Sequence, residues 1–481
     1  MKINGFTIKE LFLENKSLKQ TIFKNMTWLS VSEFVTRLFS FFLTVFIARI
    51  LGAESYGLLT FAISLTAFFS ILLGFCNDSI IIRELNQRKE AKSELGTVLG
   101  FRIILGIIVF FLIIGISFFV QEAARSLVVV FASVVLVDAV STFFKAAFRA
   151  IQKIEYVALA EVGKSISLTG AGILVLVFYP NINLISYAYL LGNITAFLIG
   201  FLGIRRLFTF PSLSFNYGII RKYFFLSWPL ALGAVLNIVY IQIDSVMMGF
   251  WGMVREVGWY QAAYKIINFV TFFGVVKIVL FPAIAQAFKK SREYFQRIIN
   301  RFFELVSFIA LPVMAGGFLL SKEIILFLYD DGFYPSVLAF KILIFVSGLI
   351  LFTLLADAVL ISGGYQKIIF YLTGSTALLN VALNFILIPK YSLYGAAIAT
   401  LISYAFLFLL SFIVLKRFRL LPNLKMIFAP LLSVVVMAVF LYSGLTQQLN
   451  VISQIGIAGS LYLTVFFGVF LLKGKLMRIK N

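Results

Sequence analysis

Residues 27–50 read TWLSVSEFVTRLFSFFLTVFIARI, a stretch long enough to cross the hydrocarbon core of a membrane as one helix. Only three of its residues carry a charge, namely Glu33, Arg37 and Arg49. Its polar residues recur at helical spacing and so share one face, which consists of Ser30, Glu33, Arg37, Ser40 and Thr44. The stretch predicts a membrane-spanning helix with one polar stripe.

The rest of the 481-residue chain has a similar composition, with 62% hydrophobic residues, 13% charged residues and a mean hydropathy of +1.04. These values exclude a soluble globular protein. They predict an all-α polytopic membrane protein. Fourteen apolar stretches have about the length of a span: 27–50, 56–76, 96–120, 126–150, 156–179, 184–204, 224–250, 258–288, 301–321, 336–361, 366–388, 393–415, 425–443 and 451–472.

The connections between these stretches are too short to house a soluble catalytic domain. The sequence also lacks the Gly-x-x-x-x-Gly-Lys-Ser/Thr, Gly-x-Ser-x-Gly and His-Glu-x-x-His motifs of common enzymes. It contains no His, and its single cysteine, Cys76, predicts a buried thiol instead of a disulfide. We therefore expect a transporter whose function lies within the helix bundle, without enzyme activity, metal or cofactor.

If the chain crosses the membrane at all fourteen stretches, its 41 Lys and Arg residues are divided unequally between the two sides. Thirty lie on the side that holds both termini and four lie on the other side, so both termini are expected in the cytoplasm of a cell membrane. This alternation along the chain also argues against a nucleic-acid partner, despite the net charge of +21. Seven cations fall inside apolar stretches: Arg37, Arg49, Arg102, Lys164, Lys265, Lys277 and Lys341. Of these, Arg102 and Lys164 lie near span ends, where we expect their side chains to snorkel to the interface.

The first 24 residues alternate charged residues with Phe and Leu and lack a small-residue cleavage site. They predict a cytoplasmic interfacial helix and not a signal peptide.

The chain also repeats itself. Residues 51–62 align with residues 252–263 at an offset of 201, residues 149–156 with 363–370 at 214, and residues 180–184 with 389–393 at 209. The pattern predicts two parallel six-helix lobes at 25–204 and 224–415, a cytoplasmic linker at 205–223, and two extra helices with a tail at 416–481. Transporters often carry their substrate between two such halves.

The polar stripe of the first stretch has two interpretations. Glu33 and Arg37 are four residues apart and can neutralise each other as a local pair. Because the stripe extends well beyond this pair, it can also line a wet cavity, and we count Glu33, Arg37 and Arg49 as candidate cavity residues.

The seventh and eighth stretches carry similar faces, formed by Asn237, Tyr240 and Asp244 and by Gln261, Tyr264, Lys265 and Asn268. Asp244 and Lys265 can pair, which would make them structural. Lys277 has no acid nearby in the sequence and is a better candidate for binding an anion. Asp138 and Asp357, in the fourth and tenth stretches, are candidates for ion coupling, or they neutralise Lys145, Lys341 or a neighbouring helix.

Three segments resemble a known family. Residues 48–62 (ARILGAESYGLLTFA) resemble the start of polysaccharide, O-antigen type flippases. Residues 242–248 (QIDSVMM) with 256–265 (EVGWYQAAYK) resemble the opening of their second half, and residues 387–400 (LIPKYSLYGAAIAT) are similar to the segment entering their twelfth helix. The chain thus looks like a member of the multidrug/oligosaccharidyl-lipid/polysaccharide exporter superfamily.

This resemblance implies two six-helix lobes and the movement of a polyprenyl-pyrophosphate-linked oligosaccharide to the outer leaflet, for cell-surface polysaccharide synthesis. It implies the lipid-linked glycan and membrane lipids as partners, with glycosyltransferases and a polymerase in the same pathway. The rivals are a multidrug or cation antiporter and a lipid II flippase of the same superfamily, and a membrane glycan polymerase or glycosyltransferase. The excess of cations over acids within the stretches favours an anionic cargo over a cationic drug.

Overall fold

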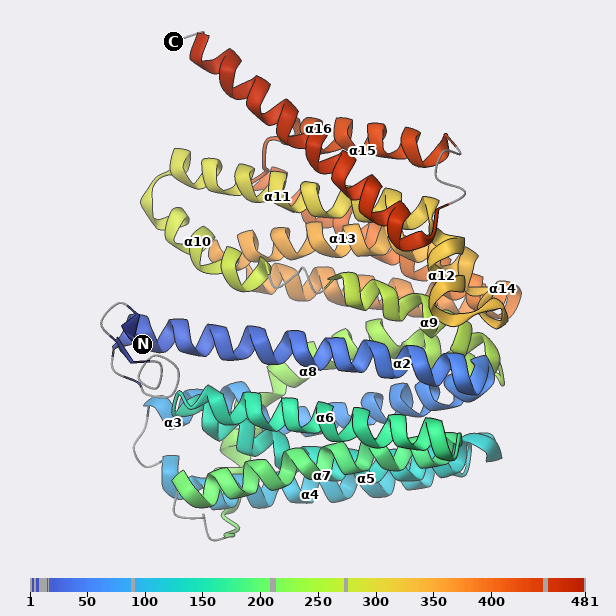
Figure 1. Ribbon diagram of the computed structural model, residues 1–481. Coiled ribbons are helices and arrows are strands. Elements are labelled where there is room, and N and C mark those ends of the chain that lie inside the picture. Colours follow the sequence, from blue (N-terminus) through green and yellow to red (C-terminus); the bar gives the residue numbers. More distant parts are fainter. Residues whose placement is uncertain are drawn as a thin grey trace. The chain divides into compact units, whose positions relative to one another are not determined.

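The computed structural model describes residues 2–3, 6–7, 15, 17–87, 91–207, 213–271, 276–443 and 449–479, and it is almost entirely helical (Figure 1). It divides into two compact units, Met1–Gly258 and Trp259–Asn481, called here the N-terminal and C-terminal units. The helices of the N-terminal unit are α2 (Leu18–Ser70), the 3₁₀ helix η1 (Ile71–Cys76), α3 (Asp78–Gln87), α4 (Ala91–Ser117), α5 (Glu122–Ala150), α6 (Ile154–Phe178), α7 (Ile182–Leu207), α8 (Tyr217–Phe250) and the start of α9 (Val254–Val270). The C-terminal unit holds the rest of α9, α10 (Val276–Lys290), α11 (Arg292–Leu319), α12 (Ser321–Tyr329), η3 (Asp331–Phe333), α13 (Ser336–Ser362), α14 (Gln366–Arg417), η4 (Leu424–Ile427), α15 (Phe428–Tyr442) and α16 (Val451–Ile479).

Eleven helices among the described residues are long and apolar enough to cross a membrane. Two of them are double. In α2 the chain turns at Gly52, whose φ is +77°, and in α14 it turns at Ser392, whose φ is +52°. Each therefore contains two of the predicted stretches, while the eighth stretch covers α9 and α10. The predicted helical, polytopic fold is confirmed.

The N-terminal segment differs from the prediction. Lys2–Ile3 and Phe6–Thr7 pair as two short antiparallel strands, β1 and β2, and α2 begins at Leu18. The expected interfacial helix over residues 1–24 is therefore wrong for the two strands, whereas residues 18–24 are helical as the start of α2. The sequence between the strands is Asn4-Gly5, the dipeptide that most favours a two-residue hairpin turn.

The predicted repeat has a physical counterpart at a pair of glycines in the N-terminal unit. A Cβ atom on Gly57 would lie 1.9 Å from the carbonyl oxygen of Val254, and one on Gly258 would lie 1.9 Å from that of Ala53. Gly57 aligns with Gly258 in the repeat at the offset of 201, and Ala53 aligns with Val254 at the same offset. The second half of α2 and the start of α9 thus touch backbone to backbone through equivalent residues, as small residues permit in membrane helices.

The core of the N-terminal unit is aromatic. Phe143, Phe144 and Phe148 of α5 are buried with Cys76 of η1 and Tyr223 of α8. The burial of Cys76 agrees with the thiol predicted from the sequence. Because η1 and α8 share this core, the first half of α8 belongs to the N-terminal unit, and the division of the chain falls inside α9. The lobe boundaries expected from the sequence at 205–223 remain a prediction.

In the C-terminal unit, α11, α13 and α14 enclose one apolar core, which includes Phe303, Phe352 and Leu355. The last two helices, α15 and α16, pack on α11 and α12 through Met437 and Tyr462, and the Tyr462 hydroxyl donates to the carbonyl oxygen of Phe308 at 2.9 Å. A cavity of about 300 Å³ lies between these helices and is lined almost wholly by apolar atoms.

Candidate functional site

The polar stripe of α2 begins with the pair predicted from the sequence. Arg37 Nη2 lies 2.7 Å from Glu33 Oε1, and Arg37 Nε donates to the same oxygen at 2.8 Å. Both side chains stay accessible, with exposures of 42% for Arg37 and 50% for Glu33. Further along the stripe Ser40 is half-buried and Thr44 is buried, while Arg49 is exposed. The local pair is therefore confirmed, and the exposed part of the stripe ends at about Ser40.

The predicted polar face of α8 is mostly buried. Tyr240 and Asp244 are 6% and 2% exposed, while Asn237 is exposed. An aspartate at this depth is costly unless a partner stabilises its charge.

The candidate residues of α9 lie in the C-terminal unit. Tyr264 is buried and stacks on Tyr260 with ring centroids 5.8 Å apart, and the Tyr260 hydroxyl is 3.1 Å from Thr400 Oγ1. Gln261 and Lys265 are half-buried, and Asn268 is exposed. Since Asp244 belongs to the other unit, its pairing with Lys265 stays a prediction.

Two further candidates are placed only in part. Lys277 lies in α10, but its side chain is outside the described residues. Asp357 is half-buried in α13. Their roles in anion binding and ion coupling stay predictions.

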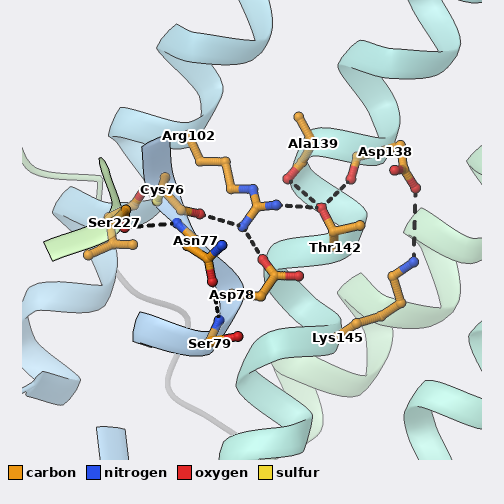
Figure 2. A network of polar contacts seen from close by, with 11 residues as sticks. Cys76, Asn77, Asp78, Ser79, Arg102, Asp138, Ala139, Thr142, Lys145 and Ser227 are labelled. Carbon is orange, nitrogen blue, oxygen red and sulfur yellow. Dashed lines mark hydrogen bonds and ion pairs between the residues drawn. The ribbon is translucent and has the colours of Figure 1, made fainter. Parts of the chain in front are cut away.

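A buried ion pair in the N-terminal unit was not expected from the sequence (Figure 2). Arg102 of α4 is 5% exposed and pairs with Asp78 at the start of α3. It also donates to the carbonyl oxygen of Cys76 at 3.1 Å and to Thr142 Oγ1 at 2.8 Å, and Thr142 in turn donates to the Asp138 carbonyl oxygen at 2.7 Å. The prediction that Arg102 snorkels is wrong, because the break between η1 and α3 places a carboxylate and a carbonyl beside it.

Asp138 belongs to a triad with one ammonium between two carboxylates. Lys145 Nζ lies 3.9 Å from Asp138 Oδ1 (Figure 2). It lies 2.7 Å from Glu161 Oε1 on α6. Lys145 is buried, whereas the Asp138 and Glu161 side chains are 37% and 33% exposed. The interpretation that Asp138 neutralises Lys145 is therefore confirmed, although Glu161 holds the shorter contact and was missed as its partner.

Two more lysines, Lys164 and Lys24, bind polar groups inside the N-terminal unit. Lys164 Nζ donates to Asn193 Oδ1 of α7 at 2.8 Å, so its predicted snorkelling is also wrong. Lys24, which is fully buried, lies 3.1 Å from Glu155 Oε2 at the start of α6. Together with the triad, these contacts form a seam of charged and amide groups along α5 and α6. Among the described residues no cluster of His, Cys, Asp and Glu could hold a metal ion.

Residues 22–288, more than half of the chain, match the family described as "Polysaccharide biosynthesis protein". The chain belongs to this polysaccharide biosynthesis family. The resemblance seen in the sequence is thereby confirmed, and this family member is a multi-pass membrane protein.

A curated relative of this family member is an uncharacterized membrane protein of Methanocaldococcus jannaschii, 27% identical over 416 residues, which are 79% of this chain and 93% of the relative. Among solved structures, the fold is similar to the lipid II flippase MurJ in an inward closed conformation, with a TM-score of 0.77, 17% identity, and coverage of 92% of this chain and 98% of MurJ. It is also similar to an inward-facing multidrug resistance MATE family transporter of the MOP superfamily, with a TM-score of 0.65, 16% identity, and coverage of 80% and 94%. At these identities the structures establish a shared fold.

Proposed function

We propose that this protein is a flippase that moves a polyprenyl-pyrophosphate-linked oligosaccharide across the cytoplasmic membrane by alternating access. The membership of the polysaccharide biosynthesis family carries this proposal. The likeness to MurJ supports it, because MurJ is by name a lipid II flippase and shares the fold. Glycosyltransferases and a polymerase of the same pathway would supply and consume the transported unit.

The charges at membrane depth are consistent with an anionic cargo. A pyrophosphate needs cations and hydrogen-bond donors that replace its water. Arg37 combines a cation with an exposure of 42%, and the half-buried Lys265 stands beside Gln261 and Tyr264 on α9. We assign Arg37, Lys265 and Lys277 to binding of the pyrophosphate, with Arg49, Asn237, Tyr240 and Asn268 near the glycan.

The test is transport in proteoliposomes that contain a fluorescent polyprenyl-pyrophosphate oligosaccharide and are exposed to a membrane-impermeant quencher. We expect Arg37→Gln and Lys265→Gln to slow flipping roughly tenfold each, since a hydrogen bond to a charged group is worth more than a neutral one. Arg125→Gln, which removes a cation from the first turn of α5, serves as the matched control. Uptake of a cationic dye without movement of the glycan lipid would favour the multidrug antiporter, and elongation of the glycan would favour a polymerase.

We further propose that Asp138 couples transport to a proton gradient. Its carboxylate is partly exposed and 3.9 Å from the only ammonium in the triad, beyond hydrogen-bond distance, so water can reach it while Glu161 retains Lys145. Asp138→Asn should make transport indifferent to an imposed pH gradient, and Asp357→Asn is tested in parallel as the second candidate. A purely structural role for Asp138 would instead lower thermal stability and leave the pH dependence of transport intact.

A further inference from the structure

The two units differ in the salt bridges that their basic residues form. In the N-terminal unit, Lys24, Arg83, Lys145, Lys153 and Lys222 all form salt bridges with acids. In the C-terminal unit, exposed cations gather at the end where α10 stops, α11 starts and α14 stops: Lys289, Lys290, Arg292, Arg297, Arg301, Lys416, Arg417, Arg419 and Lys425. None of these nine forms a salt bridge with a residue that the structure describes, and the acids near them in sequence are Glu293 and Glu304.

Four of these cations flank one ordered junction. Gln296 Nε2 of α11 donates to the Leu421 carbonyl oxygen at 2.9 Å, and the Asn423 backbone N–H donates to Asn300 Oδ1 at 2.8 Å. The two amides lie one turn apart and also bond each other at 3.2 Å, so they hold the connection between α14 and η4 against α11. This amide-held connection is called here the α11–η4 junction.

The positive charges of the junction are not neutralised by acids among the described residues. Arg297 and Arg301 each follow one of the amides along α11, and they are four residues apart, a spacing at which like charges destabilise a helix. Arg419 and Lys425 stand at the two ends of the connection, and Arg419 adopts a left-handed φ of +57° that ends α14. An external anion would relieve this repulsion.

Apolar side chains lie directly beside these cations. Leu424 and Phe428, next to Lys425, are 52% and 65% exposed, and Leu305, one turn beyond Arg301, is 40% exposed. An inorganic anion would use the cations alone. A ligand with an anionic head and hydrocarbon tails would cover both the cations and the apolar side chains.

We propose that the α11–η4 junction binds the headgroup phosphate of an anionic phospholipid of the bilayer. Arg offers paired N–H donors that match phosphate oxygens, and clusters of four or more Lys and Arg at the end of a membrane helix attract anionic lipids. Because η4 leads directly into α15, a lipid held there fastens the α15–α16 pair to α11 at the end opposite α12. The site is independent of the residues assigned to the transported lipid.

The test is retention of lipid by the purified full-length protein after extraction from vesicles of phosphatidylcholine with phosphatidylglycerol, counted by native mass spectrometry. The junction variant Arg297→Gln/Arg301→Gln/Arg419→Gln/Lys425→Gln should retain at least about tenfold less phosphatidylglycerol, since a charged hydrogen bond to the phosphate contributes about tenfold or more to binding. The matched control Lys289→Gln/Lys290→Gln/Lys416→Gln/Arg417→Gln removes the same charge from the same end and should retain it.

Three results would overturn the proposal. Equal loss in both variants would mean a diffuse attraction to basic helix ends, and equal retention of both lipids would mean no headgroup selectivity. If the junction binds inorganic phosphate at millimolar concentration and retains no lipid, it is a site for a soluble anion. If the fourfold variant does not fold, the pair Arg419→Gln/Lys425→Gln replaces it, with Lys416→Gln/Arg417→Gln as its control.

Discussion

Arg102 shows how a single residue can connect three elements. Its guanidinium joins Asp78 of α3, the Cys76 carbonyl at the end of η1 and Thr142 of α5, and its Nε has no hydrogen-bond partner among the described residues. Arg102→Met would leave the Asp78 carboxylate without its cation. We expect it to lower the free energy of unfolding by about 3 kcal/mol, the lower end for a broken buried pair, because Asp78 is still 29% exposed.

Thermal unfolding in detergent, followed by tryptophan fluorescence, measures this loss. The double variant Arg102→Met/Asp78→Leu removes both charges, so it should recover part of the stability that the single variant loses. An Arg102→Met variant that unfolds at the same temperature as the parent would contradict the structural role of the pair.

At the residue scale, only local pairs could be predicted from the sequence. Glu33 and Arg37 are one helical turn apart, so their contact follows from helix geometry alone. Arg102 and Asp78 are 24 residues apart and meet only because η1 interrupts the chain between α2 and α3. The hydropathy pattern ends an apolar stretch at Cys76, but it does not show that Asp78 comes to lie beside Arg102, so the sequence predicts snorkelling.

Among the helices, the second half of α2 and the start of α9 approach each other closely at the glycine pair Gly57 and Gly258. A methyl group on Gly57 would overlap the Val254 carbonyl at 1.9 Å, and the atom in the way belongs to backbone that cannot rotate aside. We expect Gly57→Ala to force these helices apart and to cost roughly 2–3 kcal/mol, at the upper end for overpacking. Gly170→Ala is the matched control, since a Cβ there meets nothing within 4 Å in the middle of α6 and alanine favours a helix.

The comparison uses the unfolding midpoint of the two variants in the same detergent. A loss for Gly57→Ala together with no loss for Gly170→Ala supports the backbone contact. Equal midpoints would show that the two helices can separate at no cost.

The elements themselves were largely predictable, because a span of apolar residues has one stable form in lipid. The exceptions have local causes. The Asn4-Gly5 pair favours strands where alternating charge suggested a helix, and the turns at Gly52 and Ser392 occupy only one or two residues, so that α2 and α14 run on as double elements. The division of the chain within α9 could not be predicted, since it depends on which core the first half of α8 joins.

For the molecule as a whole, the repeat of the sequence and the pairing of its glycines agree on the relation between the two halves. Gly52 and Gly252 both turn the chain with positive φ, of +77° and +80°, just before equivalent helices. The distribution of ion pairs does not follow the repeat, because the charged seam along α5 and α6 has no described counterpart of salt bridges along α13 and α14. This difference supports separate roles for the halves, with proton coupling proposed for the N-terminal unit and lipid binding for the C-terminal unit.

The orientation of the whole chain is the last expectation to test. The fourteen predicted crossings would place both termini on one side, and the excess of Lys and Arg there predicts that this side is the cytoplasm. In a Cys76→Ala background, single cysteines replace exposed residues on the two sides: Arg206, Lys289 and Arg419 on one, and Tyr179, Lys322 and Lys390 on the other.

A membrane-impermeant maleimide applied to intact cells should label cysteines at Tyr179, Lys322 and Lys390, and should reach the other three only after permeabilisation. The reverse pattern would invert the protein and place the α11–η4 junction at the outer leaflet. If the cysteine at Tyr179 is labelled and the one at Lys390 is not, the chain crosses the membrane one time fewer between them than predicted. The two repeats would then not be parallel. The side of the membrane on which the cations lie therefore matters for function as much as their number does.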